Sequence, residues 1–212
     1  NESFNVANQQ FKLNAQGGAG YSEPSGVLAF HNTFVTGNYY AWGQESSAPV
    51  HNSRLSNNLF YAHPTAGSLL FSPPVPAGMI DYNAYFPDNT YTWMEAGVGY
   101  RNFNGLANVK AANSIIEAHG VVLTANTFDR AFPQLTNYQT RQNPLYLQLA
   151  AGSPALDTAQ LIPNINDTFT GAGPDIGAYE RGCALPWYGP RPEGMDESNQ
   201  RRGCEPAGAP TG

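Results

Sequence analysis

The chain has 212 residues, of which 41% are hydrophobic and only 12% are charged, and its formal net charge at pH 7 is −6. It is long enough for one domain with a substantial core, but its charged fraction is about half of that usual in soluble proteins. Because Lys12 and Lys110 are its only lysines and no run of 18 apolar residues occurs, the composition argues against a nucleic-acid partner and a membrane span. This profile is typical of a β-rich extracellular protein.

Short runs with the composition of β-strands dominate the chain before residue 104. They are separated by clusters of Gly, Pro, Asn or Ser, as strands are. No stretch in this part shows helical periodicity with capping residues. The clearest runs are residues 27–30, 33–36, 68–71 and 79–82. We therefore predict strands throughout this part.

A short motif, Asn followed by any residue and then an aromatic one, recurs here at a nearly constant step. The copies begin at Asn32, Asn58 and Asn83, so the steps are 26 and 25 residues. Such a period is typical of a leucine-rich repeat, a turn of a parallel β-helix or half of a longer helical repeat. The lack of closely spaced leucines and of helical periodicity favours the parallel β-helix.

The motif also predicts which side chains are stacked. In a β-helix each residue lies above the residue one turn earlier, so the three asparagines should bond to one another through their amides, as in the ladders of cross-β structures. Side chains alternate along a strand, so the aromatic residues two positions later should form a parallel inward column. The alternative is coincidence in a chain rich in asparagine.

The pattern changes at Asn104. The spacing of Leu106, Val109, Ile115 and Ile116 predicts a helical or 3₁₀ excursion that ends at Gly120. Residues 121–150 are predicted to be loop with short extended pieces.

Two motifs precede the Pro- and Gly-rich C-terminal tail: Gly-Ser-Pro-Ala-Leu-Asp at 152–157 and Asp-Ile-Gly-Ala-Tyr-Glu at 175–180. This pair resembles the closing segment of bacterial secreted right-handed parallel β-helix proteins, the pectate-lyase-like superfamily. The asparagine motifs and residues 117–120 also look like that group, so the resemblance covers most of residues 20–181. It implies an all-β, right-handed parallel β-helix, with coils and closing segment in residues 1–181. It leaves activity open, because the superfamily includes lyases, glycoside hydrolases, epimerases and proteins without known catalysis.

Residues within these motifs are predicted to be structural. Asp157, Asp175 and Glu180 should bond backbone N–H groups at turns. Gly152 and Gly177 should supply backbone conformations that other residues disfavour.

Residues 182–212 form a tail rich in Pro and Gly. It holds both cysteines of the chain, Cys183 and Cys204, for which a disulfide is the plain interpretation and free thiols the alternative. Its arginines suggest either a carbohydrate or partner contact or a solvated tail.

The beginning of the chain lacks the N-terminal cap usual in this group. An uncapped β-helix end exposes unpaired backbone. We therefore expect another chain at that end, either one that carries N-terminal coils or an identical subunit stacked end to end.

The first candidate site lies around the first two motifs. Exposed aromatic rings can stack against sugars, an arginine can hold a uronate carboxylate, and a histidine or arginine can abstract the neighbouring proton in a lyase reaction. The candidate catalytic residues are His31, His51 and Arg54, and the candidate substrate-binding residues are Tyr39, Tyr40, Trp42 and Glu45. The alternative is that the histidines bond backbone at turns and the aromatic residues belong to the core.

The second candidate site comprises Asp81, Glu117 and His119. Glycoside hydrolysis needs two carboxyl groups across the scissile bond. Asp81 beside Asn83 could also supply oxygen ligands for Ca²⁺, although no dense acidic loop is present and no other cofactor is indicated. The alternative is that Asp81 caps a turn and His119 anchors the excursion.

Two functional hypotheses follow. In the first, the chain is the C-terminal part of an extracellular protein, secreted or on the cell surface, that binds polysaccharide or acts on it as a lyase or glycoside hydrolase. In the second, it is a non-catalytic β-helix that stacks or docks in an extracellular assembly.

Overall fold

The computed structural model describes residues 2–6, 25–37, 39–44, 50–112, 114–131, 147–185, 193 and 204. These residues form mostly strands with one short helix, so the predicted predominance of strands is confirmed. The strands are β1 (Glu2–Val6), β2 (Leu28–Phe30), β3 (Thr33–Thr36), β4 (Tyr40–Gln44), β5 (Arg54–Ser56), β6 (Leu59–Tyr61), β7 (Gly67–Val75), β8 (Ile80–Asp81), β9 (Ala84–Phe86), β10 (Thr90–Glu95), β11 (Gly99–Asn104) and β12 (Val121–Val122), and the helix is α1 (Leu106–Ala111).

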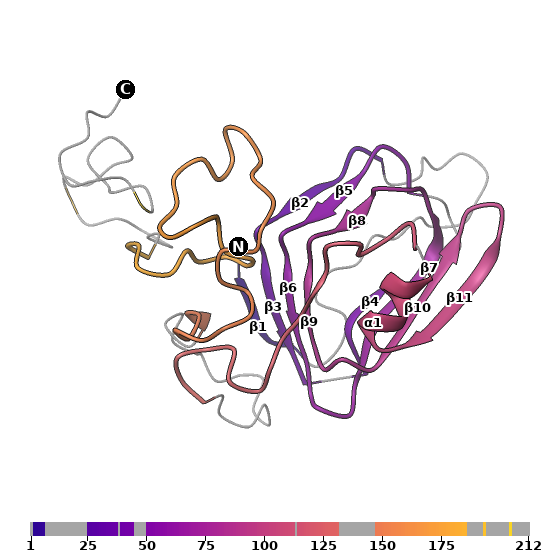
Figure 1. The fold of residues 1–212 in the computed structure, drawn as a ribbon, viewed down its shortest axis with the longest axis horizontal. Coiled ribbons are helices and arrows are strands. Elements are labelled where there is room, and N and C mark those ends of the chain that lie inside the picture. The colour runs from indigo at the N-terminus through magenta and orange to yellow at the C-terminus, as the bar shows by residue number, and fades with distance from the viewer. Residues whose placement is uncertain are drawn as a thin grey trace.

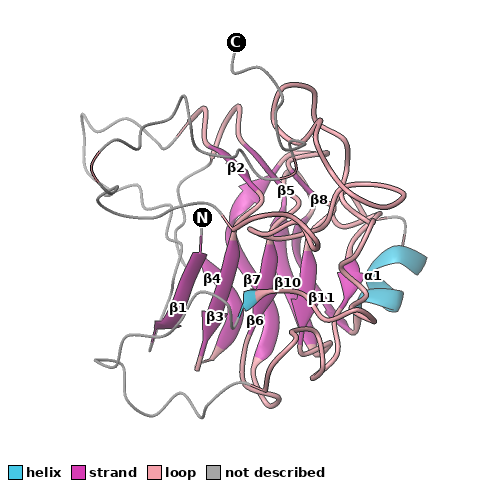
Figure 2. Cartoon of the chain, turned by 90° about the vertical axis from the view of Figure 1, so that its left-hand side faces the viewer, coloured by secondary structure: helices cyan, strands magenta, loops and turns pink. Residues whose placement is uncertain are grey.

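The strands form three sheets, ordered β1-β3-β6-β9-β12, β11-β10-β7-β4 and β2-β5-β8. The chain visits the three sheets in the same order three times, through β2-β3-β4, β5-β6-β7 and β8-β9-β10. Each returning strand pairs in parallel with the strand of the preceding passage. Figures 1 and 2 show the resulting side-by-side strands in two views. A hairpin of β10 and β11 is antiparallel and ends the second sheet.

An aromatic column fills the interior between the sheets. Phe34, Phe60 and Tyr85 occupy register positions on β3, β6 and β9. Their rings are stacked with centroids 5.3 and 5.4 Å apart, and all three are buried. The predicted inward column is therefore confirmed, because parallel pairing in register superimposes the motif copies.

The asparagine ladder lies beside this column. Asn32 Nδ2 donates to Asn58 Oδ1 at 2.8 Å, and Asn58 Nδ2 donates to Asn83 Oδ1 at 3.0 Å. The same oxygens accept the backbone N–H groups of Asn32 and Asn58 at 3.1 and 3.0 Å. All three asparagines are buried, so the predicted ladder is confirmed.

Helix α1 packs against the last passage through the sheets. Leu106 and Val109 are buried in the interior cluster. The helix ends at Ala111, well before Gly120. After it, Ile116 is buried and the Glu117 N–H donates to the carbonyl of Ile80 at 3.0 Å, so the chain has already returned to the β2-β5-β8 side.

The segment from Gly152 to Glu180, which contains the two C-terminal motifs and is called the closing segment below, lies along the outer face of the sheet that contains β3, β6 and β9, as its orange trace in Figure 1 shows. Ile176 and Ala155 are fully buried in a second core cluster with Val35, Leu59 and Ala84. The middle strands of this sheet are therefore covered on both faces, by the aromatic column and by the closing segment.

Backbone contacts fix the closing segment to the strands. The Gly177 N–H donates to the carbonyl of Asn57 at 2.9 Å, and the Ala178 N–H donates to Thr33 Oγ1 at 2.8 Å. Gly177 has φ of 112°, as predicted, whereas Gly152 has no such conformation and nothing near its missing side chain. The prediction for Gly152 is therefore wrong.

The acidic residues of the motifs hold this segment together internally. Asp157 accepts the backbone N–H of Ala172 at 2.9 Å, Asp175 accepts those of Asp157 and Arg181 at 2.9 and 2.7 Å, and Glu180 accepts that of Asp175 at 2.8 Å. Their predicted bonding to turn backbone is confirmed.

We expect Gly177→Ala to weaken the contact between the closing segment and the strands and so to lower the free energy of unfolding. A Cβ at this position would lie 2.8 Å from Thr33 Oγ1 and 3.3 Å from Leu59 Cβ. Overpacking of about 1–3 kcal/mol adds to a left-handed strain of about 1–2 kcal/mol. Urea unfolding measures the decrease in the free energy of unfolding, and Gly152→Ala is the control in the same segment. Equal stability of the two variants would contradict this account of the contact.

Cys183 and Cys204 form a disulfide with Cα atoms 4.7 Å apart, which confirms the predicted pairing. Disulfides persist in oxidising compartments, so the bond suggests an extracellular environment. Within the described part of the chain, no helix combines the length and apolar character needed to cross a membrane.

Candidate functional site

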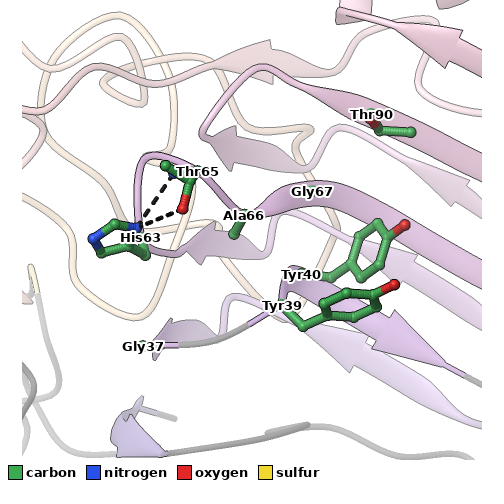
Figure 3. Close-up of a pocket in the computed structure, with 8 residues that line it drawn as sticks. All are labelled: Gly37, Tyr39, Tyr40, His63, Thr65, Ala66, Gly67 and Thr90. Atoms are coloured by element: carbon green, nitrogen blue, oxygen red, sulfur yellow. Dashed lines mark hydrogen bonds between the residues drawn. The ribbon is translucent and has the colours of Figure 1, made fainter.

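A surface cavity of about 350 Å³ lies where the chain passes from the β3-β6-β9 sheet toward β4, β7 and β10 (Figure 3). All three passages contribute to it: the loop and first residue of β4, the loop from β6 into β7, and the first residue of β10. Its lining residues are Gly37, Tyr39, Tyr40, His63, Thr65, Ala66, Gly67 and Thr90. We call it the tyrosine cavity.

Two aromatic rings dominate this cavity. Tyr39 is 70% exposed and Tyr40 is partly buried, and their ring centroids lie 4.8 Å apart in an edge-to-face arrangement. The Tyr39 carbonyl accepts the N–H of Gly67 at 2.9 Å. A Cβ on Gly67 would overlap the Tyr40 ring, so the missing side chain at that position makes room for the ring. The structure thus brings together two of the predicted substrate-binding residues.

The polar part of the lining comes from residues that the sequence analysis did not single out. His63 Nδ1 lies 2.9 Å from Thr65 Oγ1 and accepts the Thr65 N–H at 3.4 Å. This bond to a backbone donor makes Nδ1 the acceptor, so Nε2 carries the proton of the neutral ring. The periodic spacing could have identified this loop, since Gly67 lies one passage of the chain, 27 residues, after its register partner Tyr40.

The other predicted substrate-binding residues lie elsewhere. Trp42 is 2% exposed and its ring is stacked on Phe60 at 4.9 Å, so it belongs to the core and offers no face to a ligand. The physical reason is the register of β4 with Leu69 on β7, which places Trp42 in the interior cluster. Glu45 lies outside the described residues.

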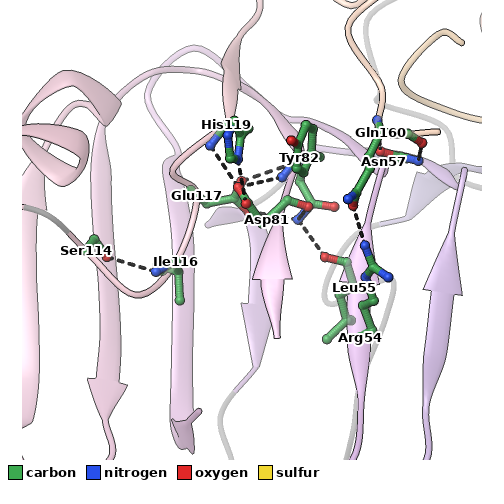
Figure 4. Close-up of polar contacts among 11 residues, drawn as sticks. Arg54, Leu55, Asn57, Asp81, Tyr82, Ser114, Ile116, Glu117, His119 and Gln160 are labelled. Carbon is green, nitrogen blue, oxygen red and sulfur yellow. Dashed lines mark hydrogen bonds and ion pairs between the residues drawn. The ribbon is translucent and has the colours of Figure 1, made fainter. Parts of the chain in front are cut away.

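The predicted catalytic residues Arg54, His51 and His31 do not line the cavity. Arg54 on β5 donates to Gln160 Oε1 (Figure 4), and its guanidinium lies 5.8 Å from the Phe30 ring centroid. His51 is exposed and forms a backbone bridge with Ser25.

His31 instead binds the closing segment. Its Nδ1 lies 3.2 Å from the Gly177 carbonyl, and its Nε2 accepts from the amides of Asn57 and Asn166 at 3.0 and 2.8 Å. Nε2 is therefore unprotonated and Nδ1 carries the proton. Burial lowers the pKa of His31, against the opposing effect of the Gly177 and Asp175 backbone groups.

Asp81 and His119 form a surface pair (Figure 4). His119 Nδ1 lies 2.8 Å from Asp81 Oδ2, while Asp81 Oδ1 accepts the N–H groups of Tyr82 and His119 at 2.9 and 2.8 Å. The Tyr82 and His119 rings are stacked with centroids 4.3 Å apart. An Asp that accepts from Nδ1 fixes the tautomer and leaves Nε2 as the basic nitrogen.

Glu117 lies behind this pair, inside the core. It is 0% exposed, its Oε1 accepts from Asn83 Nδ2 at 2.8 Å and Tyr85 OH at 2.7 Å, and its Oε2 accepts the Asn83 N–H at 3.2 Å. It is the last acceptor of the asparagine ladder. Burial raises the pKa of Glu117 to about 7, although the bonds from Asn83 and Tyr85 oppose this. A carboxyl group in this position does not meet a polysaccharide, so the structure does not support the predicted hydrolase pair with Asp81.

The oxygen atoms considered for Ca²⁺ are used in other contacts. Asn83 Oδ1 is buried and accepts from Asn58, and Asp81 bonds to His119. Among the described residues, no three His, Cys, Asp or Glu side chains are grouped so that they could hold a metal ion.

No protein-family model, curated protein or solved structure matches this chain significantly.

Proposed function

We propose that the chain is a right-handed parallel β-helix protein of the extracellular space that binds polysaccharide. The β-helix is supported by the parallel pairing of successive passages through three sheets visited in constant order, by the asparagine ladder and by the C-terminal motifs. The disulfide supports the extracellular environment.

The binding site in this proposal is the tyrosine cavity. The observation that carries it is the highly exposed ring of Tyr39 beside Tyr40 at a cavity of about 350 Å³. Ligand sites of this size combine aromatic surface with a few placed polar groups. Sugars have apolar faces that pack on aromatic rings and hydroxyl groups that bond to side chains such as Thr65 and Thr90.

We expect Tyr39→Ala to weaken glycan binding at least about tenfold, since an exposed aromatic anchor commonly contributes most of the energy of such a contact. Affinity electrophoresis of the wild type against a panel of soluble polysaccharides selects the ligand, and calorimetry measures its Kd. Tyr100→Ala is the matched control, because Tyr100 on β11 is 62% exposed and does not line the cavity.

Two outcomes would contradict the proposal. One is a wild-type protein that binds no glycan of the panel, which would favour a purely structural role. The other is a Tyr39→Ala variant that binds as tightly as the Tyr100→Ala control.

A further inference from the structure

We propose that the tyrosine cavity binds an uncharged oligosaccharide and discriminates against polyuronates. This inference rests on the proposed carbohydrate binding and names the class of its ligand. It replaces the expectation, drawn from the sequence, that Arg54 holds a uronate carboxylate beside the tyrosines.

The first argument for an uncharged ligand is the absence of fixed charge in the described lining of the cavity. Its described lining residues include no carboxylate, lysine or arginine, and their titratable groups are two tyrosine hydroxyls and the His63 imidazole. A uronate carboxylate that enters such a site loses hydration without gaining a fixed cationic partner. An uncharged sugar does not incur that cost.

The second argument is that Arg54 and Arg101 lie outside the cavity and already have polar partners. Arg54 is on β5, in the β2-β5-β8 sheet, and bonds to Gln160 of the closing segment. Arg101 on β11 pairs with Glu95 at 3.5 Å. Neither lines the cavity, and a chain with net charge −6 repels a polyanion at long range.

The uncharged polar groups match sugar hydroxyls. Tyr39, Tyr40, Thr65 and Thr90 each carry a hydroxyl that both donates and accepts hydrogen bonds, and His63 adds one donor from its ring. Sugar hydroxyls also donate and accept, so the lining offers them hydrogen bonds in both directions.

The extent of the lining indicates more than one sugar ring. Its residues come from three successive passages of the chain, at β4, β7 and β10, which are neighbours in one sheet. Adjacent strands lie about 4.8 Å apart, so the lining spans roughly 10 Å across them. A short oligosaccharide laid across the strands contacts both tyrosines and the threonines.

Calorimetry on the full chain with matched sugar pairs tests this inference. The pairs are gluco-, manno- and galacto-oligosaccharides and the same oligomers oxidised at C6 to uronates, each at low and high salt. We expect the neutral member of at least one pair to bind at least about tenfold more tightly than its uronate, with little dependence on salt.

A second variant links the preference to the cavity. Gly67→Ala should push the Tyr40 ring aside and weaken binding of the neutral oligomer severalfold, while Gly152→Ala, with open space at its Cβ, should not. The inference is overturned, with carbohydrate binding intact, if a uronate binds as tightly as its neutral partner or if Gly67→Ala leaves neutral binding unchanged. If no member of any pair binds, the proposed function itself fails.

Discussion

Replacing Asn58 by leucine is expected to lower the free energy of unfolding by about 4 kcal/mol or more. Leucine has a similar shape, so the change isolates hydrogen bonding from packing. It leaves the N–H and Nδ2 donors of Asn32, the carbonyl of Ala29 and one bond of Asn83 Oδ1 without their partner. Each buried polar group that loses its partner costs about 1–3 kcal/mol. The total is a large part of the 5–15 kcal/mol typical of a whole domain.

Urea unfolding followed by circular dichroism measures this effect. Asn102→Leu on β11 is the matched control, because Asn102 is an exposed strand residue. If Asn58→Leu does not yield soluble protein, the milder Asn58→Ser still tests the ladder through its unfolding midpoint. A loss no larger than that of the control would show that the ladder contributes little.

Replacing Glu117 by glutamine is expected to change how stability depends on pH. The pKa of Glu117 is raised from 4.5 to about 7 in the folded protein. The folded state therefore binds this proton more tightly than the unfolded chain does, so its stabilising effect is complete below pH 4.5 and is lost as the pH rises through about 7. The shift corresponds to a loss on the order of 3 kcal/mol. Glutamine does not titrate, so the Glu117→Gln variant should lack this decrease in stability with rising pH.

The quantity to measure is the difference in unfolding free energy between wild type and Glu117→Gln. Glutamine still offers one oxygen to Asn83 Nδ2 and Tyr85, but its amide faces the Asn83 N–H, so the variant should be less stable than the wild type near pH 4.5. Above pH 7 this difference in unfolding free energy should become smaller or change sign. Other titrating groups, including His31, are shared by both proteins and largely cancel in the difference.

Tyr85→Phe provides a second test of the same carboxyl group. The Tyr85 hydroxyl bond lowers the pKa of Glu117, so its removal should move the pH-dependent loss to higher pH. A gap between wild type and Glu117→Gln that stays constant with pH would contradict a raised pKa, whatever the absolute stabilities of the variants.

The repeated motif predicted the stacked columns because its copies are separated by one passage of the chain each. Asn32, Asn58 and Asn83 are spaced by one passage of the chain, and in-register parallel pairing then requires that they stack, with Phe34, Phe60 and Tyr85 beside them. Hydrogen bonds and ring contacts confirm both columns. The disulfide between Cys183 and Cys204 was likewise predictable, since the chain offers no other cysteine.

The burial of Glu117 and Trp42 could not be predicted from the spacing of the motif. Glu117 ends the ladder although it lies outside the 25-residue step, and it looked like a catalytic acid because sequence does not report burial. Trp42 looked like a sugar platform because an aromatic residue near a loop can face either side until the register of β4 with β7 is known.

The sequence by itself therefore determined the repeat, its inward residues and the parallel strands, because these depend on spacing along one chain. Only the tertiary structure decided that the closing segment covers the outer face of the β3-β6-β9 sheet, that His31 and Arg54 bind that segment, and that Tyr39 and Tyr40 share a cavity with Thr65 and Thr90. These contacts join residues distant in sequence, and no periodic signal specifies which surface a non-repeating segment will cover or which loops it leaves open.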